Sequence, residues 1–303
     1  MLKKRDIPRT LAKSLHRFKQ SVVNWRERAI LKTLFILDLT CNPSLEELGE
    51  EPMQLRESLG VRDGEMVSLI GAGGKTTTLL QLAKELRDAG KKVLVTTTTK
   101  IFKPSKPHVD RLFIVEDIDA LLREATKLDP PLIIGAGSKL DQDKLIGLPP
   151  RWLDEIARSK HFAAVLVEAD GAASRLFKVP SDFEPVIPGA TSLTIWVLSI
   201  KVVGKPLDGT SVHRAETAAA LSGMPLGTPV TEQLILNLAR HPEGCLKGIP
   251  AASRKSAMIN QADSPEEIER AKQLGKALLQ LEFDRVVINS FVDSGLSNEV
   301  ISH

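Results

Sequence analysis

The chain has 303 residues, of which 42% are hydrophobic and 26% charged, a composition typical of a globular protein with a sizeable core. No apolar run reaches the roughly 18 residues that a membrane span needs, and a formal net charge of +3 is too small to indicate nucleic-acid binding by itself. The two cysteines, Cys41 and Cys245, are far apart and belong to no CxxC or Cys/His cluster, so we expect neither a disulfide framework nor structural zinc, and a reducing cytoplasm fits best.

Residues 1–60 are predicted to form a basic helical extension. One apolar helical stripe is made by residues at alternating steps of four and three, namely Leu11, Leu15, Phe18, Val22, Trp25 and Ala29. Lysine and arginine occupy much of the remaining face. Such a helix suits docking to an acidic partner or to an anionic membrane surface, and it equally suits packing on the protein's own domain. After a break at Asn42-Pro43-Ser44, another helix is predicted from near Leu45.

Residues 61–303 are predicted to form an α/β domain, because short apolar runs alternate with helical patterns. The predicted strands are Met66–Ile70, Lys92–Thr97, Arg111–Val115, Pro131–Ile134, Ala163–Val167, Leu193–Leu198, Ser256–Ile259 and Val286–Asn289. The predicted helices are Lys75–Ala89, Asp117–Lys127, Ala215–Leu221, Thr231–Ala239 and Pro265–Leu281. This alternation indicates βαβ units and a doubly wound, mostly parallel sheet with helices on both faces.

A glycine-rich segment between the first strand and the first helix of this domain is the most specific motif. It consists of Gly71, Ala72, Gly73, Gly74, Lys75, Thr76 and Thr77. Glycines allow backbone N–H groups to converge on phosphates, and the helix presents its N-terminus to the anion. We expect Lys75 to reach the β- and γ-phosphates from an exposed position, and Thr76 to offer its hydroxyl to Mg²⁺.

The loop is shorter than the full G-x-x-x-x-G-K-T motif, since Leu69 stands where the first glycine would be. The form G-x-x-G-K-T-T occurs in some P-loop ligases and kinases. An incidental glycine turn at a strand–helix junction is the alternative. Because strand, Lys-Thr and helix follow in the required order, the sequence favours phosphate binding.

Carboxylates and hydroxyls are predicted at the same edge of the sheet. Glu168 and Asp170 follow an apolar strand, as in a Walker B segment, and strand alternation places both on one face. They are candidates for the Mg²⁺ shell and for catalysis together with Lys75, although either could simply end a strand or cap a turn. Thr98 lies in a run of four threonines, whose hydroxyls could hold Mg²⁺ or a water at the γ-phosphate, but threonine is also a common strand residue.

A second polar cluster, Asn260-Gln261-Ala262-Asp263, resembles the N-K-x-D base-reading motif of GTPases. In that motif the aspartate pairs with the N1 and N2 donors of guanine, so Asn260 and Asp263 favour GTP slightly over ATP. Gln261 replaces the lysine whose stem lies against the base. The next residues, from Ser264 to Glu267, also form a capping box with proline at the first helical position, and helix capping alone would account for the cluster.

Two further polar segments lie outside these motifs. Lys178 and Glu184 belong to one, and His213 and Arg214 to the other. Arg214 could meet an anionic substrate, and His213 could act as an acid or base, although a lone histidine is more often structural.

Taken in series, the motifs GAGGKTTT, VLVTTTTK, VLVEADGA, KVPSDFEPVIP, VHRAE and NQAD resemble the YqeC-like family over roughly residues 55–289. These proteins are described as P-loop accessory proteins of selenium-dependent hydroxylases. The resemblance implies a P-loop NTPase fold, Mg²⁺ with GTP or ATP, and a role in maturing a selenium-dependent molybdenum hydroxylase. The hydroxylase or its cofactor would be the partner, and no nucleic acid is expected. The resemblance also assigns a substrate or partner face to Lys178, Glu184, His213 and Arg214.

Two other functions stay open on the residues. The short loop also fits a small-molecule kinase or an ATP-dependent ligase, which would phosphorylate or activate a metabolite. A nucleotide-gated binding module with negligible turnover fits as well. Partner-stimulated hydrolysis would indicate the NTPase, and a phosphorylated or activated metabolite would indicate the kinase or ligase. Single-turnover measurements with labelled nucleotide separate the binding module from both enzymes.

Overall fold

The computed structural model describes residues 53–292 and 297–302. The predicted stripe from Leu11 to Ala29 and the helix near Leu45 lie outside the described residues, as does Cys41. Within the described residues no helix is both long and apolar enough to cross a membrane.

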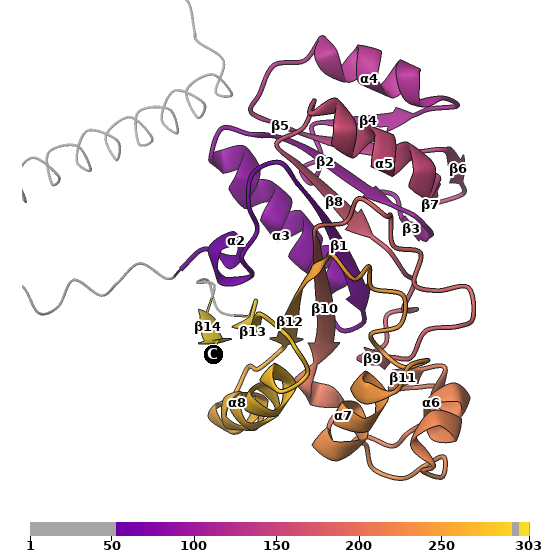
Figure 1. Cartoon of the computed structure of the whole chain (residues 1–303), viewed down its shortest axis with the longest axis vertical. Coiled ribbons are helices and arrows are strands. Elements are labelled where there is room, and N and C mark those ends of the chain that lie inside the picture. Colours follow the sequence, from indigo (N-terminus) through magenta and orange to yellow (C-terminus); the bar gives the residue numbers. More distant parts are fainter. Residues whose placement is uncertain (1–52, 293–296, 303) are drawn as a thin grey trace, which may run out of the picture. The chain divides into compact units, whose positions relative to one another are not determined.

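A nine-stranded sheet forms the centre of the fold (Figure 1). Its strands are β1 (Glu65–Gly71), β2 (Lys92–Thr97), β4 (Arg111–Ile114), β5 (Leu132–Gly137), β8 (Ala164–Glu168), β10 (Leu193–Ser199), β12 (Arg254–Asn260), β13 (Arg285–Ser290) and β14 (Ser297–Ser302). The spatial order is β14-β13-β12-β10-β1-β8-β2-β5-β4, and all pairs are parallel except β13 with β14. The predicted mostly parallel α/β fold is confirmed, and β1, which precedes the glycine loop, is the central strand.

The α-helices of the described residues are α2 (Leu55–Ser58), α3 (Lys75–Asp88), α4 (Ile118–Thr126), α5 (Pro150–Ser159), α6 (Ala215–Ser222), α7 (Glu232–Arg240) and α8 (Pro265–Leu279). Several begin at the side-chain caps that the sequence indicates. The Asp117 carboxylate accepts from the Ala120 N–H, and the Thr231 and Ser264 hydroxyls accept from the N–H groups three residues on.

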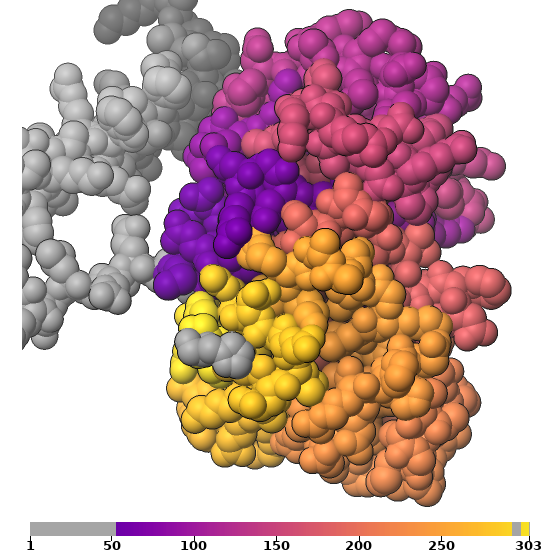
Figure 2. All heavy atoms as spheres, viewed as in Figure 1, coloured from indigo at the N-terminus to yellow at the C-terminus, as the bar shows by residue number. Residues whose placement is uncertain are grey.

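Helices cover both faces of the sheet. On one face α3 buries Leu79, Leu82 and Leu86 against alternate residues of the strands, among them Val67 and Ile195. At about 1.5–3 kcal/mol for each fully buried leucine, this contact contributes substantially to fold stability. On the other face α4 and α5 pack at one end of the sheet, and α6, α7 and α8 at the other (Figure 1). Figure 2 shows the same division, with the indigo-to-magenta and orange-to-yellow residues at opposite ends.

Several short elements are absent from the sequence prediction. A three-stranded antiparallel sheet is formed by β3 (Lys100–Phe102), β7 (Lys144–Ile146) and β6 (Lys139–Asp141). A parallel pair is formed by β9 (Phe177–Lys178) and β11 (Val212–His213), and a 3-10 helix, η1, spans Ile200–Val202. Strands of two or three residues are too short to show an alternating pattern.

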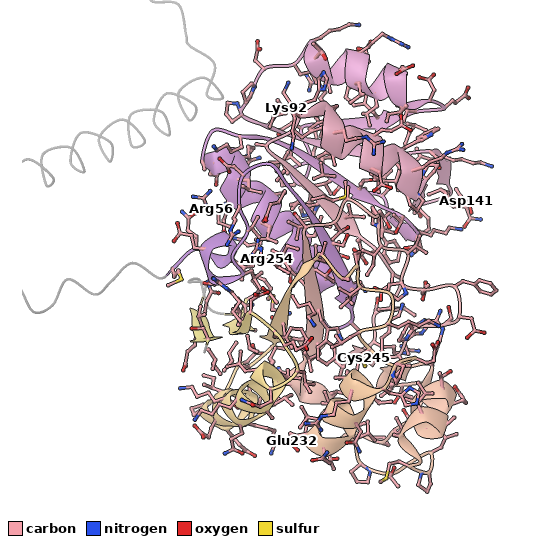
Figure 3. The ribbon with its side chains drawn as sticks, viewed as in Figure 1. Arg56, Lys92, Asp141, Glu232, Cys245 and Arg254 are labelled. Carbon is pink, nitrogen blue, oxygen red and sulfur yellow. The ribbon has the colours of Figure 1, made fainter. Side chains whose placement is uncertain are left out.

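Residues 53–60, which the prediction assigned to the N-terminal extension, pack in the core of the α/β domain. Leu55 and Leu59 are fully buried against α3 and its neighbours. The Glu85 carboxylate of α3 accepts from the Leu55 and Arg56 N–H groups, at 3.2 and 2.8 Å. Arg254, labelled with Arg56 in Figure 3, donates to the Gly60 carbonyl at 2.9 Å. The start of α2 is therefore fixed by α3, and the residue after its end by strand β12.

Candidate functional site

The glycine loop runs from the end of β1 to the first residue of α3, and its conformation requires glycine. Gly71, Gly73 and Gly74 have φ of 94°, 79° and 137°, a region that other residues rarely adopt. A Cβ atom on Gly73 would lie 2.6 Å from the Ser199 backbone nitrogen, and one on Gly71 would lie 2.2 Å from the Val197 carbonyl. The loop is thus pressed against the neighbouring strand β10.

The N–H groups at the start of this loop are already bonded within the protein. Gly71 donates to the Asp170 carboxylate at 3.0 Å, Ala72 to the Val197 carbonyl at 2.9 Å, and Gly73 to the Arg175 carbonyl at 3.0 Å. At these three residues, the N–H groups that were expected to converge on phosphates are directed to acceptors within the protein. The donors that a helix leaves without an internal acceptor are those of its first turn, which begins at Lys75.

Lys75 is buried rather than exposed, with 3% of its surface accessible. Its Nζ lies 2.9 Å from Asp170 Oδ1 and 3.8 Å from Glu168 Oε1, and it donates to the Gly71 carbonyl at 2.5 Å. The expectation of an exposed lysine is wrong because the ends of β1 and β8 lie side by side and bring two carboxylates under the first turn of α3.

The side chains of Glu168 and Thr76 contact each other beside Lys75. The Thr76 hydroxyl donates to Glu168 Oε2 at 2.8 Å. Burial raises the pKa of Glu168 above its usual range, although the Lys75 charge and the Thr76 hydrogen bond act in the opposite direction. The residues predicted for catalysis and for Mg²⁺ are therefore brought together: Lys75, Thr76, Glu168 and Asp170.

A series of ion pairs, buried at Asp170 and Lys178 and partly exposed at Glu184 and Arg214, leads from this site to the other predicted candidates. Lys178, on β9, is 2% exposed and lies 3.2 Å from Asp170 and 2.7 Å from Glu184. Arg214 lies 2.9 Å from the same Glu184 oxygen. Burial raises the pKa of Glu184, but the Lys178 hydrogen bond and the charges of Lys178 and Arg214 bring it below its usual range. Burial, then the Arg214 charge, lowers the pKa of His213.

Because Lys178 is fully enclosed, it contributes to no open face of the domain. Its role within the fold is to neutralise Asp170 and Glu184 together, and it also donates to the Gly171 carbonyl. The structure thus places four of the candidates close to one another: Lys178, Glu184, His213 and Arg214. Lys178 connects them to the glycine loop, because it pairs with Asp170, which accepts from the Gly71 N–H.

The threonines at the end of β2 and directly after it donate to main-chain oxygens. Thr98 donates to the Val186 carbonyl at 2.7 Å, Thr97 to the Glu168 carbonyl at 2.7 Å, and Thr96 to the Ala136 carbonyl at 2.8 Å. These bonds account for the hydroxyls without a ligand, which favours the structural interpretation of this run.

Asn260 supports the glycine loop directly. Its amide nitrogen donates to the Gly73 carbonyl at 2.8 Å, and its amide oxygen accepts from Asn289 Nδ2 at 2.9 Å. The loop after β12 therefore contacts the loop after β1, with β10 between the two strands. Gln261, the next residue, lines the pocket beside the glycine loop.

Asp263 is held by two partners at the start of α8. Ser290 donates to one carboxylate oxygen at 2.6 Å, and Lys201 Nζ lies 2.5 Å from the other. Burial raises the pKa of Asp263, but these two partners outweigh burial and lower it overall. The capping interaction predicted here is also present, since the Glu267 N–H donates to the Ser264 hydroxyl at 3.2 Å.

A pocket of about 310 Å³ opens at the glycine loop. One wall is the loop with the first turn of α3, and the other carries Phe102 and Lys144 of the small antiparallel sheet. Arg175 lines the pocket from beside the glycine loop, since its carbonyl accepts from the Gly73 N–H. The sequence analysis singled out none of these three pocket residues. Phe102 could have been found, because it follows β2 at the strand edge where ligands bind in parallel sheets. Lys144 had no such signal, since it reaches the pocket only through the antiparallel pairing of β7 with β3.

Fold and site together define an α/β protein with a mostly parallel sheet, in which the central strand enters a glycine-rich loop beside a lysine and two carboxylates. The model of the family described as YqeC protein matches residues 67–216. The uncharacterized protein YqeC of Escherichia coli (strain K12) is 29% identical over 221 residues, which cover 73% of this chain and 85% of that protein. The chain is thus similar to YqeC proteins over most of its length, and the resemblance of its motifs to that family is confirmed.

Proposed function

We propose that this chain binds a nucleoside triphosphate with Mg²⁺ at the glycine loop and hydrolyses it, as a P-loop NTPase. The observation that carries the proposal is the convergence of Lys75 and Thr76 with Glu168 and Asp170 at the carboxyl edge of the sheet. Phosphoryl transfer needs little covalent chemistry from a protein, so positioning and charge neutralisation are what such a site must supply.

Lys75 changes partners in this proposal. Its ammonium group lies against Asp170, and the β- and γ-phosphates would take over part of that contact. Asp170 keeps a counterion throughout, because Lys178 lies 3.2 Å from its second oxygen. The N–H groups of the first turn of α3 and the positive end of the helix dipole would add to phosphate binding.

The residues present fit Mg²⁺. A hydroxyl oxygen of Thr76 and a carboxylate of Glu168 lie 2.8 Å apart beside the pocket, and Mg²⁺ is usually held by one or two such groups together with phosphate oxygens and water. Bound Mg²⁺ neutralises charge on the phosphates during transfer. Asp170 is already shared by Lys75 and Lys178, so Glu168 is the carboxylate nearer to a metal role and Asp170 the one that positions Lys75.

We assign the nucleobase to the side of the loop formed by residues 260–263, with GTP preferred to ATP. The lowered pKa of Asp263 keeps its carboxylate ionised at neutral pH, as acceptance from two guanine donors requires. Lys201 would have to yield its place beside that carboxylate. The helix cap at Ser264 is the competing explanation, and equal affinities for GTP and ATP would favour it.

The cellular role is proposed from the family resemblance. Hydrolysis would serve the maturation of a selenium-dependent molybdenum hydroxylase, with that enzyme or its cofactor as the partner. Stimulation of hydrolysis by the partner would support an accessory NTPase. A small-molecule kinase or ligase would instead give a phosphorylated or activated metabolite.

The proposal is tested by titrating fluorescent N-methylanthraniloyl GTP and ATP, with and without Mg²⁺, into three variants. Lys75→Met removes the ammonium group, and Thr76→Val removes the hydroxyl while keeping the shape. Lys84→Met is the matched control, because Lys84 lies on the same helix, is exposed and pairs only with Asp88 among the described residues.

Loss of charge-assisted contacts worth about 1.5–3 kcal/mol corresponds to a roughly ten- to hundredfold weaker Kd. We expect that loss for Lys75→Met, a loss of Mg²⁺ dependence for Thr76→Val, and wild-type binding for Lys84→Met. Equal affinities in Lys75→Met and Lys84→Met would contradict the assignment.

A further inference from the structure

The wall opposite the glycine loop carries an exposed aromatic ring. Phe102, the last residue of β3, is 64% exposed and lines the pocket, while its neighbour Ile101 is buried and anchors the strand. The Lys144 ammonium group lies 3.0 Å from the centroid of the ring. A large apolar side chain left open in a pocket offers surface that a ligand can bury.

The same wall is cationic. Lys100 and Lys144, both of the small antiparallel sheet, line the pocket there. Lys100 is paired with Asp141 at 2.5 Å, and Asp141 is labelled in Figure 3 at the outer edge of the small sheet. Across residues 53–292 and 297–302, no carboxylate lies within ion-pair distance of Lys144. The wall therefore has positive charge available for an anion in addition to Lys75.

Sheet order separates this wall from the proposed base side. The strand β3 follows β2, which lies beyond β8 on one side of β1, whereas residues 260–263 follow β12, which lies beyond β10 on the other side. A triphosphate lying along the first turn of α3 would have its base on the β12 side. Its terminal phosphate would then face the wall that carries Phe102.

We propose that this wall binds a second substrate, an anionic molecule with a planar or aromatic body, beside the terminal phosphate. The inference rests on the proposed nucleotide site. Phe102 would stack against the body of the molecule, while Lys144 would meet its acidic group. A neutral nucleobase carries no charge for the Lys144 ammonium group to neutralise, so the wall fits an anionic ligand better than it fits the base.

The test uses 1-naphthyl phosphate as the probe, titrated by its fluorescence into the full chain. It is run with and without saturating β,γ-imido-GTP and Mg²⁺, with inorganic phosphate and 1-naphthol as competitors. Phe102→Ala and Lys144→Ala are compared with matched controls. Phe183→Ala removes a phenylalanine that is 88% exposed and does not line the pocket, and Lys139→Ala removes an exposed lysine of the same small sheet.

With nucleotide bound, we expect naphthyl phosphate to bind at least tenfold more tightly than phosphate or naphthol. Phe102→Ala and Lys144→Ala should each weaken it at least tenfold, while both controls and the affinity for methylanthraniloyl GTP change less than twofold. No preference for naphthyl phosphate, or full binding by Phe102→Ala, would overturn the inference. Weaker nucleotide binding by Phe102→Ala would overturn it too, by assigning the wall to the base. If no nucleotide binds the wild type, the proposed function fails separately, and the titration without nucleotide decides the inference by the same criteria.

Discussion

Asp170 and Glu168 are both buried carboxylates two residues apart, yet their surroundings differ. Asp170 is surrounded by donors, with Lys75 at 2.9 Å, Lys178 at 3.2 Å and the Gly71 N–H at 3.0 Å. Glu168 has the Thr76 hydroxyl at 2.8 Å and Lys75 only at 3.8 Å, and burial raises its pKa. The protein thus places two ammonium groups close to Asp170, whereas Glu168 has a hydroxyl and one more distant ammonium group.

Replacing each carboxylate by its amide should therefore change the free energy of unfolding differently at these two residues. Removing one partner of a buried pair costs about 3–5 kcal/mol, so Asp170→Asn should lower the free energy of unfolding by that order. Glu168→Gln should leave it unchanged or raise it at neutral pH. The folded pKa of Glu168 lies above the unfolded value, so the folded state binds the proton more tightly and loses stability as pH rises through that range.

Urea unfolding of both variants at several pH values checks this prediction. The advantage of Glu168→Gln over the wild type should shrink as pH falls towards the usual range of a glutamate. Its Mg²⁺-dependent hydrolysis should fall far more than its nucleotide binding, because charge near the metal matters most where phosphoryl charge redistributes. Similar destabilisation by both amides would show that the two carboxylates are equivalent.

At the scale of elements, the glycine loop depends on its contact with β10. Gly73 and Gly90 both have positive φ, 79° and 83°, so alanine is strained at each by roughly 1–2 kcal/mol. A Cβ at Gly90 would meet nothing within 4 Å, whereas one at Gly73 would lie 2.6 Å from the Ser199 nitrogen and 2.8 Å from the Leu176 carbonyl. Comparing alanine at the two positions therefore separates the cost of backbone strain from the cost of the collision.

We expect Gly73→Ala to be less stable than Gly90→Ala by about another 1–3 kcal/mol, the usual range for overpacking. It should also weaken nucleotide binding, because the loop can relieve the collision only by moving off β10. Chemical unfolding and nucleotide titration of both variants measure the two effects. Nucleotide affinity as high in Gly73→Ala as in Gly90→Ala would mean that the loop is not the phosphate site.

Most of the long elements could be predicted from the sequence because their patterns are local, although α5 and β14 were missed. Buried parallel strands are apolar runs, and helices begin at recognisable caps such as Thr231 and Ser264. The meeting of Thr76 with Glu168 was also foreseeable, since parallel strands end at one edge. The burial of Lys178 was not, because it depends on the pairing of β9 with β11, 35 residues away in the chain, which closes the site around Asp170 and Glu184.

At the scale of the whole molecule, residues 53–60 connect parts of the described domain that are distant in sequence. Gly60 accepts from Arg254 of β12, and the Leu59 carbonyl accepts from Ser256 of the same strand. Leu55 and Arg56 satisfy the Glu85 carboxylate of α3. A domain boundary at residue 60, as the composition suggests, would cut through these contacts.

Two truncations that differ by eight residues should therefore behave differently. Deleting residues 1–52 keeps Leu55 and Leu59, so nucleotide affinity and the free energy of unfolding should stay close to those of the full chain. Deleting residues 1–60 removes both leucines, which are fully buried, at a cost of about 3–6 kcal/mol, and leaves Glu85 without its backbone donors. Urea unfolding and nucleotide titration of both proteins provide the measurement.

The role of the basic extension is tested by offering anionic vesicles and an acidic protein surface to the full chain and to the 53–303 protein. A docking role for the extension predicts that only the full chain binds them. Loss of folding already in the 53–303 protein would show instead that the extension packs on its own domain, the other of the two interpretations of its apolar stripe.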